Sequence, residues 1–288
     1  MPLKIAFSLL LVCILWATAF PGIKIALESF SAGHLTLARH IVASISFLFI
    51  MLFKKETLLP KKRDLPIFFL LGLLGYTIYH TALNFGEMRV SAGTASLIIA
   101  TAPAFTSIVA FIILKDRLRF LAWLGIAISF VGVVLIVIGE NSQFGINIYA
   151  LLVLISAISA AFYTVLQKRV LKKYSAIQVT AYATWAGTIP LFLFAQGLPS
   201  SIIHATTNAL LATIYIGVAP SAIAYTLFSY AIANVQVSRV TSFMYLVPVF
   251  SLLFAWILLA EIPSITSLIG GVVAIIGVVL VNQFKNRN

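Results

Sequence analysis

Apolar runs long enough to cross a bilayer follow one another along almost the whole chain. A helix needs about 20 apolar residues to span the hydrocarbon core, and ten segments approach this length. They cover residues 5–27, 33–53, 66–85, 91–114, 119–138, 147–167, 177–196, 208–232, 238–260 and 264–284. The connections between them are short, which leaves no room for a soluble domain. The pattern predicts an all-α integral membrane protein with ten transmembrane helices.

The sequence also repeats itself. Residues 92–136 read as a copy of residues 237–281, shifted by 145 positions without a gap. An internal duplication in an apolar chain is typical of transporters built from repeats, whose substrate site lies between the halves. Because five spans per half is an odd number, the second copy enters the membrane in the opposite sense. We therefore expect two inverted five-helix repeats, over residues 1–140 and 145–285, that together form one transport unit.

Composition agrees with a membrane protein. The chain is 62% hydrophobic and 9% charged, with a mean hydropathy of +1.11, whereas soluble domains carry roughly 25% charged residues. A net charge of +12 would also suit a nucleic-acid-binding protein, but the basic residues lie between the apolar spans. With the N-terminus inside, all of the 19 except Lys24, Arg39 and Arg89 fall on the cytoplasmic side. The positive-inside rule thus predicts cytoplasmic N- and C-termini, and explains the charge without nucleic acid.

Prolines mark corresponding positions in the two halves. Pro103 and Pro248 are partners within the fourth and ninth spans, and Pro220 corresponds to Gly75. Proline removes a backbone hydrogen bond and kinks a helix, which leaves carbonyl groups free to line a cavity. Glycine and proline are common in membrane helices, but the matched pairs favour a hinge or cavity role for Pro103, Pro220 and Pro248.

One face of the third span combines aromatic and polar side chains. Tyr76, Tyr79, His80 and Asn84 fall at helical spacing on one stripe, and Tyr225 lies in the corresponding stripe of the eighth span. An aromatic cavity with a few polar groups suits neutral or zwitterionic solutes. Since the halves are inverted, we expect His80 toward the external side and Tyr225 toward the cytoplasmic side. For the tyrosines, the alternative is an interfacial or packing role. For the histidine, the alternatives are packing between helices and a proton relay.

Other candidates extend this predicted site. The full set of expected substrate-binding residues is Trp16, Tyr76, Tyr79, His80, Asn84, Thr101, Tyr163, Gln167, Tyr225 and Tyr245. Arg39, about one and a half turns into the second span, is interpreted as reaching the external headgroups, with contact to an anionic solute as the alternative.

Acidic residues are confined to span ends and loops, where we find Glu28, Glu56, Asp64, Glu87, Asp116, Glu140 and Glu261. This distribution disfavours proton-coupled export through a buried mid-span carboxylate, and also a site that binds cations by carboxylate pairing. Asp116 and Glu261 end their spans, and we expect them to act as caps or gates.

Signatures of other classes are missing from the sequence. It contains no H-E-x-x-H motif, no G-x-S-x-G elbow and no Walker loop, and its four histidines are dispersed. No filter loop or charged ring suggests a channel. We therefore expect no enzyme activity, no metal site and no cofactor.

Motifs in both halves resemble the EamA-type drug/metabolite transporter (DMT) superfamily. They are Ser91–Leu97, Lys115–Leu118 and Gly132–Leu135 in the first half, and Val237–Ser242, Ala260-Glu261 and Gly270–Gly277 in the second. Ala17 and Asp116 depart from the more usual Gly and Glu.

The resemblance implies a ten-helix bacterial carrier in the inner membrane. Such a carrier moves small metabolites, often amino acids and usually outward, by alternating access, without an obligate protein partner. The resemblance leaves the substrate open. An importer or exchanger of a larger cofactor-like metabolite, and a multidrug or toxic-compound exporter, are the alternatives.

Overall fold

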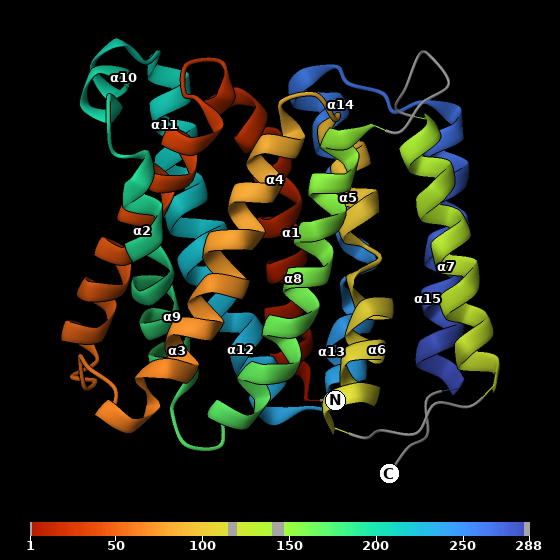
Figure 1. Cartoon of the computed structure of the whole chain (residues 1–288), viewed down its shortest axis with the longest axis horizontal. Coiled ribbons are helices and arrows are strands. Elements are labelled where there is room, and N and C mark those ends of the chain that lie inside the picture. The colour runs from red at the N-terminus through yellow and green to blue at the C-terminus, as the bar shows by residue number, and fades with distance from the viewer. Residues whose placement is uncertain (1, 115–119, 140–146, 285–288) are drawn as a thin grey trace.

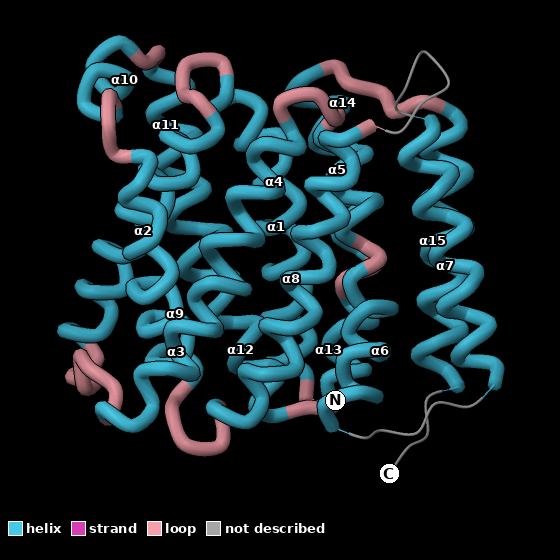
Figure 2. Tube along the Cα trace, viewed as in Figure 1, coloured by secondary structure: helices cyan, strands magenta, loops and turns pink. Residues whose placement is uncertain are grey.

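In the computed structural model, which describes residues 2–114, 120–139 and 147–284, every regular element is a helix (Figure 1, Figure 2). Within those ranges, the helices long and apolar enough to cross a membrane are Leu3–Leu27, Ala32–Phe53, Lys62–Glu87, Ala92–Ile113, Phe120–Ile138, Ile148–Val170, Ala176–Phe194 and Thr207–Asn234. Two shorter apolar helices, Leu246–Leu259 and Ile265–Val281, lie where the ninth and tenth spans were predicted. The predicted all-helical membrane class is confirmed. Asp116 and Glu140 fall outside the described residues.

The helices of the first half are α1 (Leu3–Leu27), α2 (Ala32–Phe53), the short η1 (Lys62–Asp64), α3 (Leu65–Gly72), η2 (Leu73–Ile78), α4 (Tyr79–Glu87), α5 (Ala92–Ile99), α6 (Ala102–Leu114) and α7 (Phe120–Gly139). Those of the second half are α8 (Ile148–Val170), α9 (Ala176–Leu191), η3 (Phe192–Phe194), α10 (Leu198–His204), α11 (Thr207–Ile216), η4 (Gly217–Ala224), α12 (Tyr225–Asn234), α13 (Val237–Phe243), α14 (Leu246–Leu259) and α15 (Ile265–Phe284).

Helix starts follow local capping chemistry. Ser31, Ser91, Ser175 and Thr206 each precede a helix and accept a hydrogen bond from the backbone N–H three residues later. A short hydroxyl side chain at this position satisfies one of the N–H groups that lack a partner in the first turn. The sequence thus fixes several span boundaries directly.

Two predicted spans contain a π-helical segment near their middle. The third span consists of α3, η2 and α4, and the eighth consists of α11, η4 and α12. Both segments occupy corresponding positions of the repeat, since Leu73 and Gly217 are 144 residues apart. A π-helical turn inserts one extra residue, which shifts the register of side chains and disturbs the backbone ladder.

Two other spans are broken. A break at Ala100 and Thr101 separates α5 from α6, and a break at Met244 and Tyr245 separates α13 from α14. In Figure 1, α5 lies above α6, whereas α14 lies above α13. The corresponding broken spans therefore run in opposite directions through the molecule.

The helix pair α7 and α15 stands at one edge of the molecule (Figure 1). A Cβ atom built on Gly132 would lie 2.6 Å from the Gly270 carbonyl oxygen, so glycine is needed at this crossing. Ser129 Oγ donates a hydrogen bond of 3.0 Å to the carbonyl of Ala274, the residue 145 positions later. The glycines at this crossing are Gly125, Gly132, Gly270 and Gly277. Small residues allow close backbone approach, which drives helix association in membranes.

A second close contact occurs twice, once for each repeat. Helix α3 meets α9 where Gly72 faces Gly187, and η4 meets α2 where a Cβ atom on Gly217 would lie 2.7 Å from Val42 Cβ. Gly72 and Gly217 are 145 positions apart, as are Val42 and Gly187. Both contacts join the two halves, and the offset of 145 positions relates one contact to the other.

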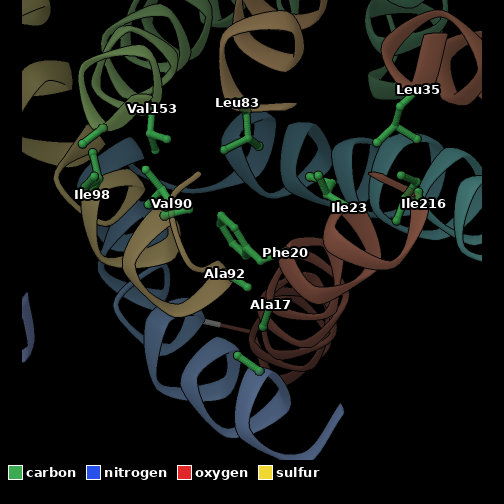
Figure 3. Packing of buried hydrophobic residues seen from close by; sticks show 14 of the residues in the cluster. Ala17, Phe20, Ile23, Leu35, Leu83, Val90, Ala92, Ile98, Val153 and Ile216 are labelled. Carbon is green, nitrogen blue, oxygen red and sulfur yellow. The ribbon is translucent and has the colours of Figure 1, made fainter. Parts of the chain in front are cut away.

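The largest core cluster joins helices from both halves (Figure 3). Phe20 and Ile23 of α1 pack there with Leu83 of α4, Val153 of α8 and Ile216 of α11, all of them buried. Large apolar side chains also cover the outside of the molecule, as in a protein surrounded by lipid. Residues that face other helices and residues that face lipid are both apolar, so hydropathy does not distinguish them, whereas burial does.

The connection between α9 and α11 contains a helix, α10, that the apolar pattern did not predict. With only seven residues, it is too short to show a hydrophobic period. His34 at the start of α2 holds this connection through a 2.8 Å hydrogen bond to Ser201 Oγ and a 2.9 Å hydrogen bond to the Gln196 carbonyl.

Candidate functional site

A cavity of about 100 Å³ lies where the two repeats meet. Its wall is formed by α1, α2, the third and fourth spans, α8, and the eighth and ninth spans. The predicted site residues that line it are Trp16, Tyr79, His80, Pro103, Tyr163, Pro220 and Tyr225. The structure thus brings together side chains that are up to about 200 positions apart in sequence.

Tyr225 lies at the centre of an aromatic cluster beside this cavity. Its ring centroid is 5.3 Å from that of Trp16, 5.0 Å from Tyr76, 6.0 Å from Tyr163 and 5.9 Å from His80. Such spacings are those of offset and edge-to-face aromatic contacts. His80 and Tyr225 therefore lie beside each other at the same cavity, and their expected displacement toward opposite faces of the membrane stays a prediction.

The π-helical segment η2 exposes backbone carbonyls that side chains from other helices satisfy. Ser159 Oγ of α8 donates a 2.7 Å hydrogen bond to the carbonyl of Leu74, and the Tyr225 hydroxyl donates one of 3.3 Å to the carbonyl of Gly75. A Cβ atom at Gly75 would come within 2.8 Å of the Tyr163 ring. The missing side chain at Gly75 is what lets Tyr163 reach the cavity.

The segment η4 shows the same arrangement in the second repeat. Pro220 has no N–H to offer the Ile216 carbonyl one turn earlier, and Ser221 Oγ donates a 2.7 Å hydrogen bond to that carbonyl instead. The Trp16 indole Nε1–H donates a 3.1 Å hydrogen bond to the carbonyl of Pro220 itself. Gly75 and Pro220, which correspond in the repeat, thus both present a carbonyl to an aromatic side chain of a neighbouring helix.

The three predicted hinge prolines differ in position. Pro220 lies inside η4, whereas Pro103 and Pro248 lie just after the two breaks, as the second residue of α6 and the third of α14. Proline is favoured in the first turn of a helix, where its missing N–H has no partner to lose. Pro103 lines the cavity and Pro248 is buried outside its wall.

Several predicted binding residues do not line the cavity. Tyr76 is fully buried behind Tyr163, and their hydroxyl oxygens are 3.3 Å apart. Thr101, in the break between α5 and α6, donates a 2.6 Å hydrogen bond to the carbonyl of Ile98 three residues earlier. Tyr245 lies at the break before α14 and is half-buried.

Asn84 and Gln167 are engaged in contacts between helices. Asn84 Nδ2 donates a 2.8 Å hydrogen bond to Thr36 Oγ1 of α2, and Gln167 Oε1 accepts one of 2.9 Å from Ser229 Oγ of α12. Both side chains are fully buried. Their position favours the packing alternative over direct substrate contact.

Arg39 differs most from its interpretation. It lies seven residues into α2, is 2% exposed and lines the cavity, so the expectation that it reaches the headgroups is wrong. Its Nη2 donates a 3.0 Å hydrogen bond to Ser221 Oγ, whereas Nε and Nη1 have no hydrogen-bond partner. The sequence does contain a signal for this position. At 1.5 Å per residue, Arg39 lies about 10 Å from the start of its helix, which is deep within the span.

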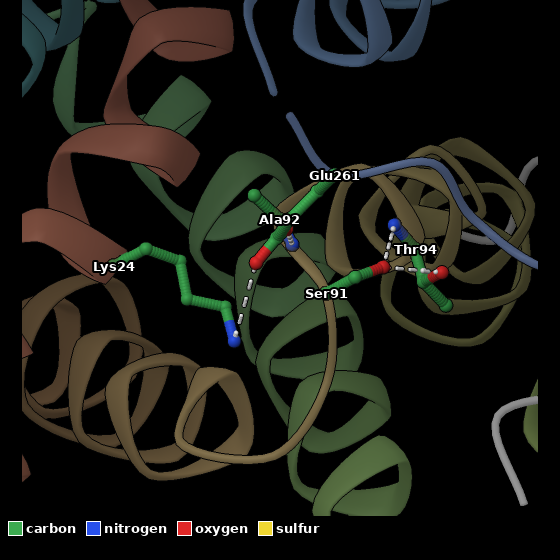
Figure 4. Close-up of polar contacts among 5 residues, drawn as sticks. All are labelled: Lys24, Ser91, Ala92, Thr94 and Glu261. Atoms are coloured by element: carbon green, nitrogen blue, oxygen red, sulfur yellow. Dashed lines mark hydrogen bonds and ion pairs between the residues drawn. The ribbon is translucent and has the colours of Figure 1, made fainter. Parts of the chain in front are cut away.

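At one end of the helices, Glu261 connects three elements (Figure 4). Its Oε2 accepts a 2.8 Å hydrogen bond from the Ala92 backbone N–H at the start of α5, and its Oε1 lies 3.9 Å from Lys24 Nζ of α1. A carboxylate is favourable at a helix N-terminus. The geometry matches the capping role expected of Glu261.

Glu87 was missed as a candidate. It ends α4 as predicted, but it is fully buried and neither carboxylate oxygen has a hydrogen-bond partner. With Lys24 and Glu28 it lines a second cavity of about 270 Å³. The spacing in the sequence could have identified it, because His80, Asn84 and Glu87 lie on one face of the same span.

Asp64 links two connections at the other end of the helices. Lys173 Nζ and the Tyr174 hydroxyl both donate hydrogen bonds to its Oδ2. The hydrogen bond from Lys173, and then that from Tyr174, lower the pKa of Asp64 below its usual value, while the same contact raises the pKa of Lys173. This contact ties the η1 segment to the connection between α8 and α9.

Among the described residues, no three His, Cys, Asp or Glu side chains gather in a way that could hold a metal ion. The arrangement offers instead an aromatic enclosure, backbone carbonyls that accept hydrogen bonds from side chains, and the buried cation of Arg39. Such a site can hold a small organic molecule without chemical change.

Comparison with known proteins gives relatives over nearly the full length. The "Uncharacterized transporter YdfC" of Bacillus subtilis is 39% identical over 268 residues, which cover 92% of this chain and 86% of the relative. The "Probable terminal-alkyne amino-acid exporter" of Streptantibioticus cattleyicolor is 35% identical over 281 residues, covering 97% and 94%. The "Uncharacterized inner membrane transporter YedA" of Escherichia coli is 28% identical over 243 residues, covering 83% and 78%.

One solved structure, titled "Crystal structure of protein", shares the fold with a TM-score of 0.67 at 16% identity, covering 97% of this chain and 96% of that one. The EamA-like transporter family matches twice, over residues 3–138 and again over residues 147–283. The chain therefore belongs to the EamA-like transporter family and is a multi-pass protein of the cell membrane.

Proposed function

We propose that this transporter is a secondary carrier that exports amino acids or related small metabolites by alternating access. The observation that carries the proposal is the aromatic cavity, to which the two repeats contribute at corresponding helix interruptions. Gly75 with Tyr79 and His80 comes from the first repeat, and Pro220 with Tyr225 comes from the second. A site formed where two repeats meet can open to either side when the repeats exchange conformations.

The proposed topology has ten spans in two repeats, over residues 1–140 and 145–285, with both termini in the cytoplasm. The opposite directions of the two broken spans in Figure 1 support an inverted arrangement. The distribution of lysine and arginine supports the sidedness. In this orientation, the end with Lys24 and Glu261 is external, and the end with Asp64 and Lys173 is cytoplasmic.

The size and lining of the cavity favour a small neutral or zwitterionic solute. Its volume of about 100 Å³ is below the roughly 300–1,000 Å³ of pockets for drug-sized ligands. This argues against the larger cofactor-like metabolite. The described cavity wall contains no carboxylate, which argues against a carrier of toxic cations. The printed name of the Streptantibioticus relative, a probable amino-acid exporter, points to the same class of substrate.

Counterflow in proteoliposomes tests the proposal. Purified full-length protein is reconstituted with unlabelled amino acids inside, and uptake of labelled leucine, phenylalanine, methionine, threonine and alanine is followed with and without a pH gradient. Saturable accumulation of at least one amino acid is expected. Independence from the gradient would favour facilitated diffusion or exchange, whereas dependence would favour the proton-relay alternative for His80. If folded protein accumulates none of the five, the amino-acid proposal is wrong.

A further inference from the structure

The guanidinium of Arg39 is a buried cation without a counterion. The residue is 2% exposed, and its single recorded hydrogen bond goes to the neutral hydroxyl of Ser221. Nε and Nη1 are buried and unpartnered. The recorded ion pairs of the described chain join Lys24 to Glu261 and Lys173 to Asp64, and neither involves Arg39.

Glu87 does not form an ion pair with Arg39. Both Glu87 oxygens are themselves without a hydrogen-bond partner, and no ion pair with an N–O distance within 4.0 Å joins the two side chains. Glu87 lines the second cavity together with Lys24, and Arg39 lines the first. The protein thus places a cation in the aromatic cavity and leaves the balancing anion to be supplied from elsewhere.

Arginine cannot escape this situation by losing its proton. Its guanidinium stays protonated in proteins, and an isolated charge is unfavourable in the membrane interior. A charged side chain that is buried, unpaired and beside a cavity therefore indicates an anionic ligand. The planar guanidinium matches a carboxylate especially well, because its N–H groups can donate two parallel hydrogen bonds.

The second repeat holds Arg39 in place. Ser221 Oγ accepts the hydrogen bond from Arg39 and donates its own to the Ile216 carbonyl, which is available because Pro220 lacks an N–H. An arginine of the first repeat is thus oriented by the interrupted helix of the second. A rearrangement of η4 would move Ser221 and with it Arg39. The hydrogen bond between these two residues would therefore couple ligand binding to helix movement.

The rings around the cavity supply the complementary part of the site. Trp16 lies 4.9 Å from Phe228 and 5.3 Å from Tyr225 between ring centroids. Aromatic faces accommodate apolar groups and also attract an ammonium group. Arg39 therefore suits a carboxylate, and the rings suit the remainder of an α-amino acid.

We propose that Arg39 binds the carboxylate of the transported solute, so that the carrier selects molecules with a free carboxylate and discriminates against their esters. This inference rests on the proposed function, because it assigns the substrate class of the same cavity. It explains why a cation lies within a span, at a cavity whose described wall is otherwise aromatic, apolar or neutral.

The test measures binding separately from transport. Thermal unfolding of the purified full chain in detergent is followed with leucine, with phenylalanine and with the methyl ester of each. We expect at least one free acid to raise the midpoint, with its ester needing at least tenfold higher concentration for the same shift. Arg39→Gln should reduce the difference between acid and ester to within twofold. Arg39→Lys, which keeps the charge but loses the planar fork, should retain part of it.

Arg89→Gln is the matched control, because Arg89 is exposed and lies outside the cavity. It should retain the full preference for the acid. If Arg39→Gln does not fold, the comparison of acid and ester on the unaltered protein and on Arg39→Lys still decides the question.

Equal stabilisation by acid and ester, or no stabilisation by either acid, would overturn the role of Arg39. Amino-acid counterflow could persist in the first case, which would leave the proposed function standing. Conversely, stabilisation by acids without any counterflow would support Arg39 as a carboxylate site and contradict the amino-acid carrier.

Discussion

Two regions of this transporter use the same duplicated sequence in contrasting ways. At the edge formed by α7 and α15, the helices are uninterrupted, and glycines bring their backbones into direct contact. Around the cavity, the corresponding elements of each repeat are interrupted by π-helical segments, and their carbonyls bond to side chains of other helices. The regular pair is suited to hold its two helices in one arrangement, because a glycine crossing tolerates little displacement.

The interrupted spans are suited to the opposite task. Backbone carbonyls in these segments accept hydrogen bonds from the side chains of Trp16, Ser159, Ser221 and Tyr225. Such bonds can exchange partners when helices move, without leaving a backbone group unsatisfied in the membrane. The comparison therefore predicts that the glycine pair provides stability and that the helices around the cavity move, and five predictions test this division.

The largest expected effect is on folding, at the glycine pair. Gly132→Leu would place a side chain where a single Cβ atom already lies 2.6 Å from the Gly270 carbonyl. We expect loss of monodisperse protein or a destabilisation of about 3 kcal/mol or more, at the upper end of overpacking effects. Size-exclusion chromatography and thermal unfolding measure this. Val131→Leu, at a position 56% exposed on the same helix, is the control and should behave as the original protein.

The next effect is on transport, at the centre of the cavity. Tyr225→Ala removes ring contacts to Trp16 and Tyr76, and we expect the counterflow rate to fall at least about tenfold with membrane expression unchanged. His80→Ala should have a similar result. Tyr225→Phe keeps the ring and loses only the hydrogen bond to Gly75, so a decrease of about threefold is expected. Normal transport in both alanine variants would remove these residues from the site.

A smaller effect is expected at the interruption itself. Pro220→Ala restores an N–H that can bond to the Ile216 carbonyl and compete with Ser221 Oγ. We expect a thermal midpoint that is unchanged or higher, together with a counterflow rate several-fold lower. An unchanged rate in a stable variant would show that η4 does not need its irregular backbone.

The contact at the external end of the proposed topology should matter less. Lys24 and Glu261 have side chains that are 19% and 28% exposed and a separation of 3.9 Å. Partly exposed ion pairs contribute up to about 1 kcal/mol. A double-mutant cycle with Lys24→Met and Glu261→Gln, read by thermal unfolding, should give a coupling energy of about 0.5 kcal/mol. Coupling well above 1 kcal/mol would show that this contact belongs with the stable region.

The smallest effect concerns pH. The hydrogen bond from Lys173 lowers the pKa of Asp64 below its usual value of 3.8, so the charged form is favoured in the folded protein. Its stabilisation is fully present above pH 3.8 and is lost as the pH falls through the lower folded value. Asp64→Asn should therefore lower the thermal midpoint at pH 6. Below pH 4, the midpoint of the variant should decrease less with falling pH than that of the original protein. Identical pH profiles would mean that the contact does not stabilise the fold.

Much of the site could be predicted because helical spacing is visible in sequence. The stripe of Tyr79 and His80, and its counterpart at Tyr225, were found from periodicity and from the repeat. Asn84 belongs to the same stripe, yet it bonds to Thr36 of a neighbouring helix instead of lining the cavity. Periodicity identifies the face of a helix that is buried, but a face can meet either another helix or a cavity.

For Arg39, the sequence predicts the position in a span but not the direction of the side chain. Its position in a span was evident, and a long side chain at that depth can either reach the headgroups or turn inward. Only the packing of α2 on η4, through the close contact of Val42 and Gly217, places Ser221 beside it. Glu87 was similarly assigned to a span end, where burial on all sides depends on neighbours that are distant in sequence.

The sequence by itself determined the membrane class, most span boundaries, the duplication and the family. These properties follow from hydropathy, capping residues and repeated order, all of which are local or countable along the chain. The tertiary structure decided which buried side chains face a cavity, which carbonyls are free to accept bonds, and which charge lacks a partner. Those properties depend on distances between helices, and they are set by where glycines allow close approach and where π-helical turns shift the register.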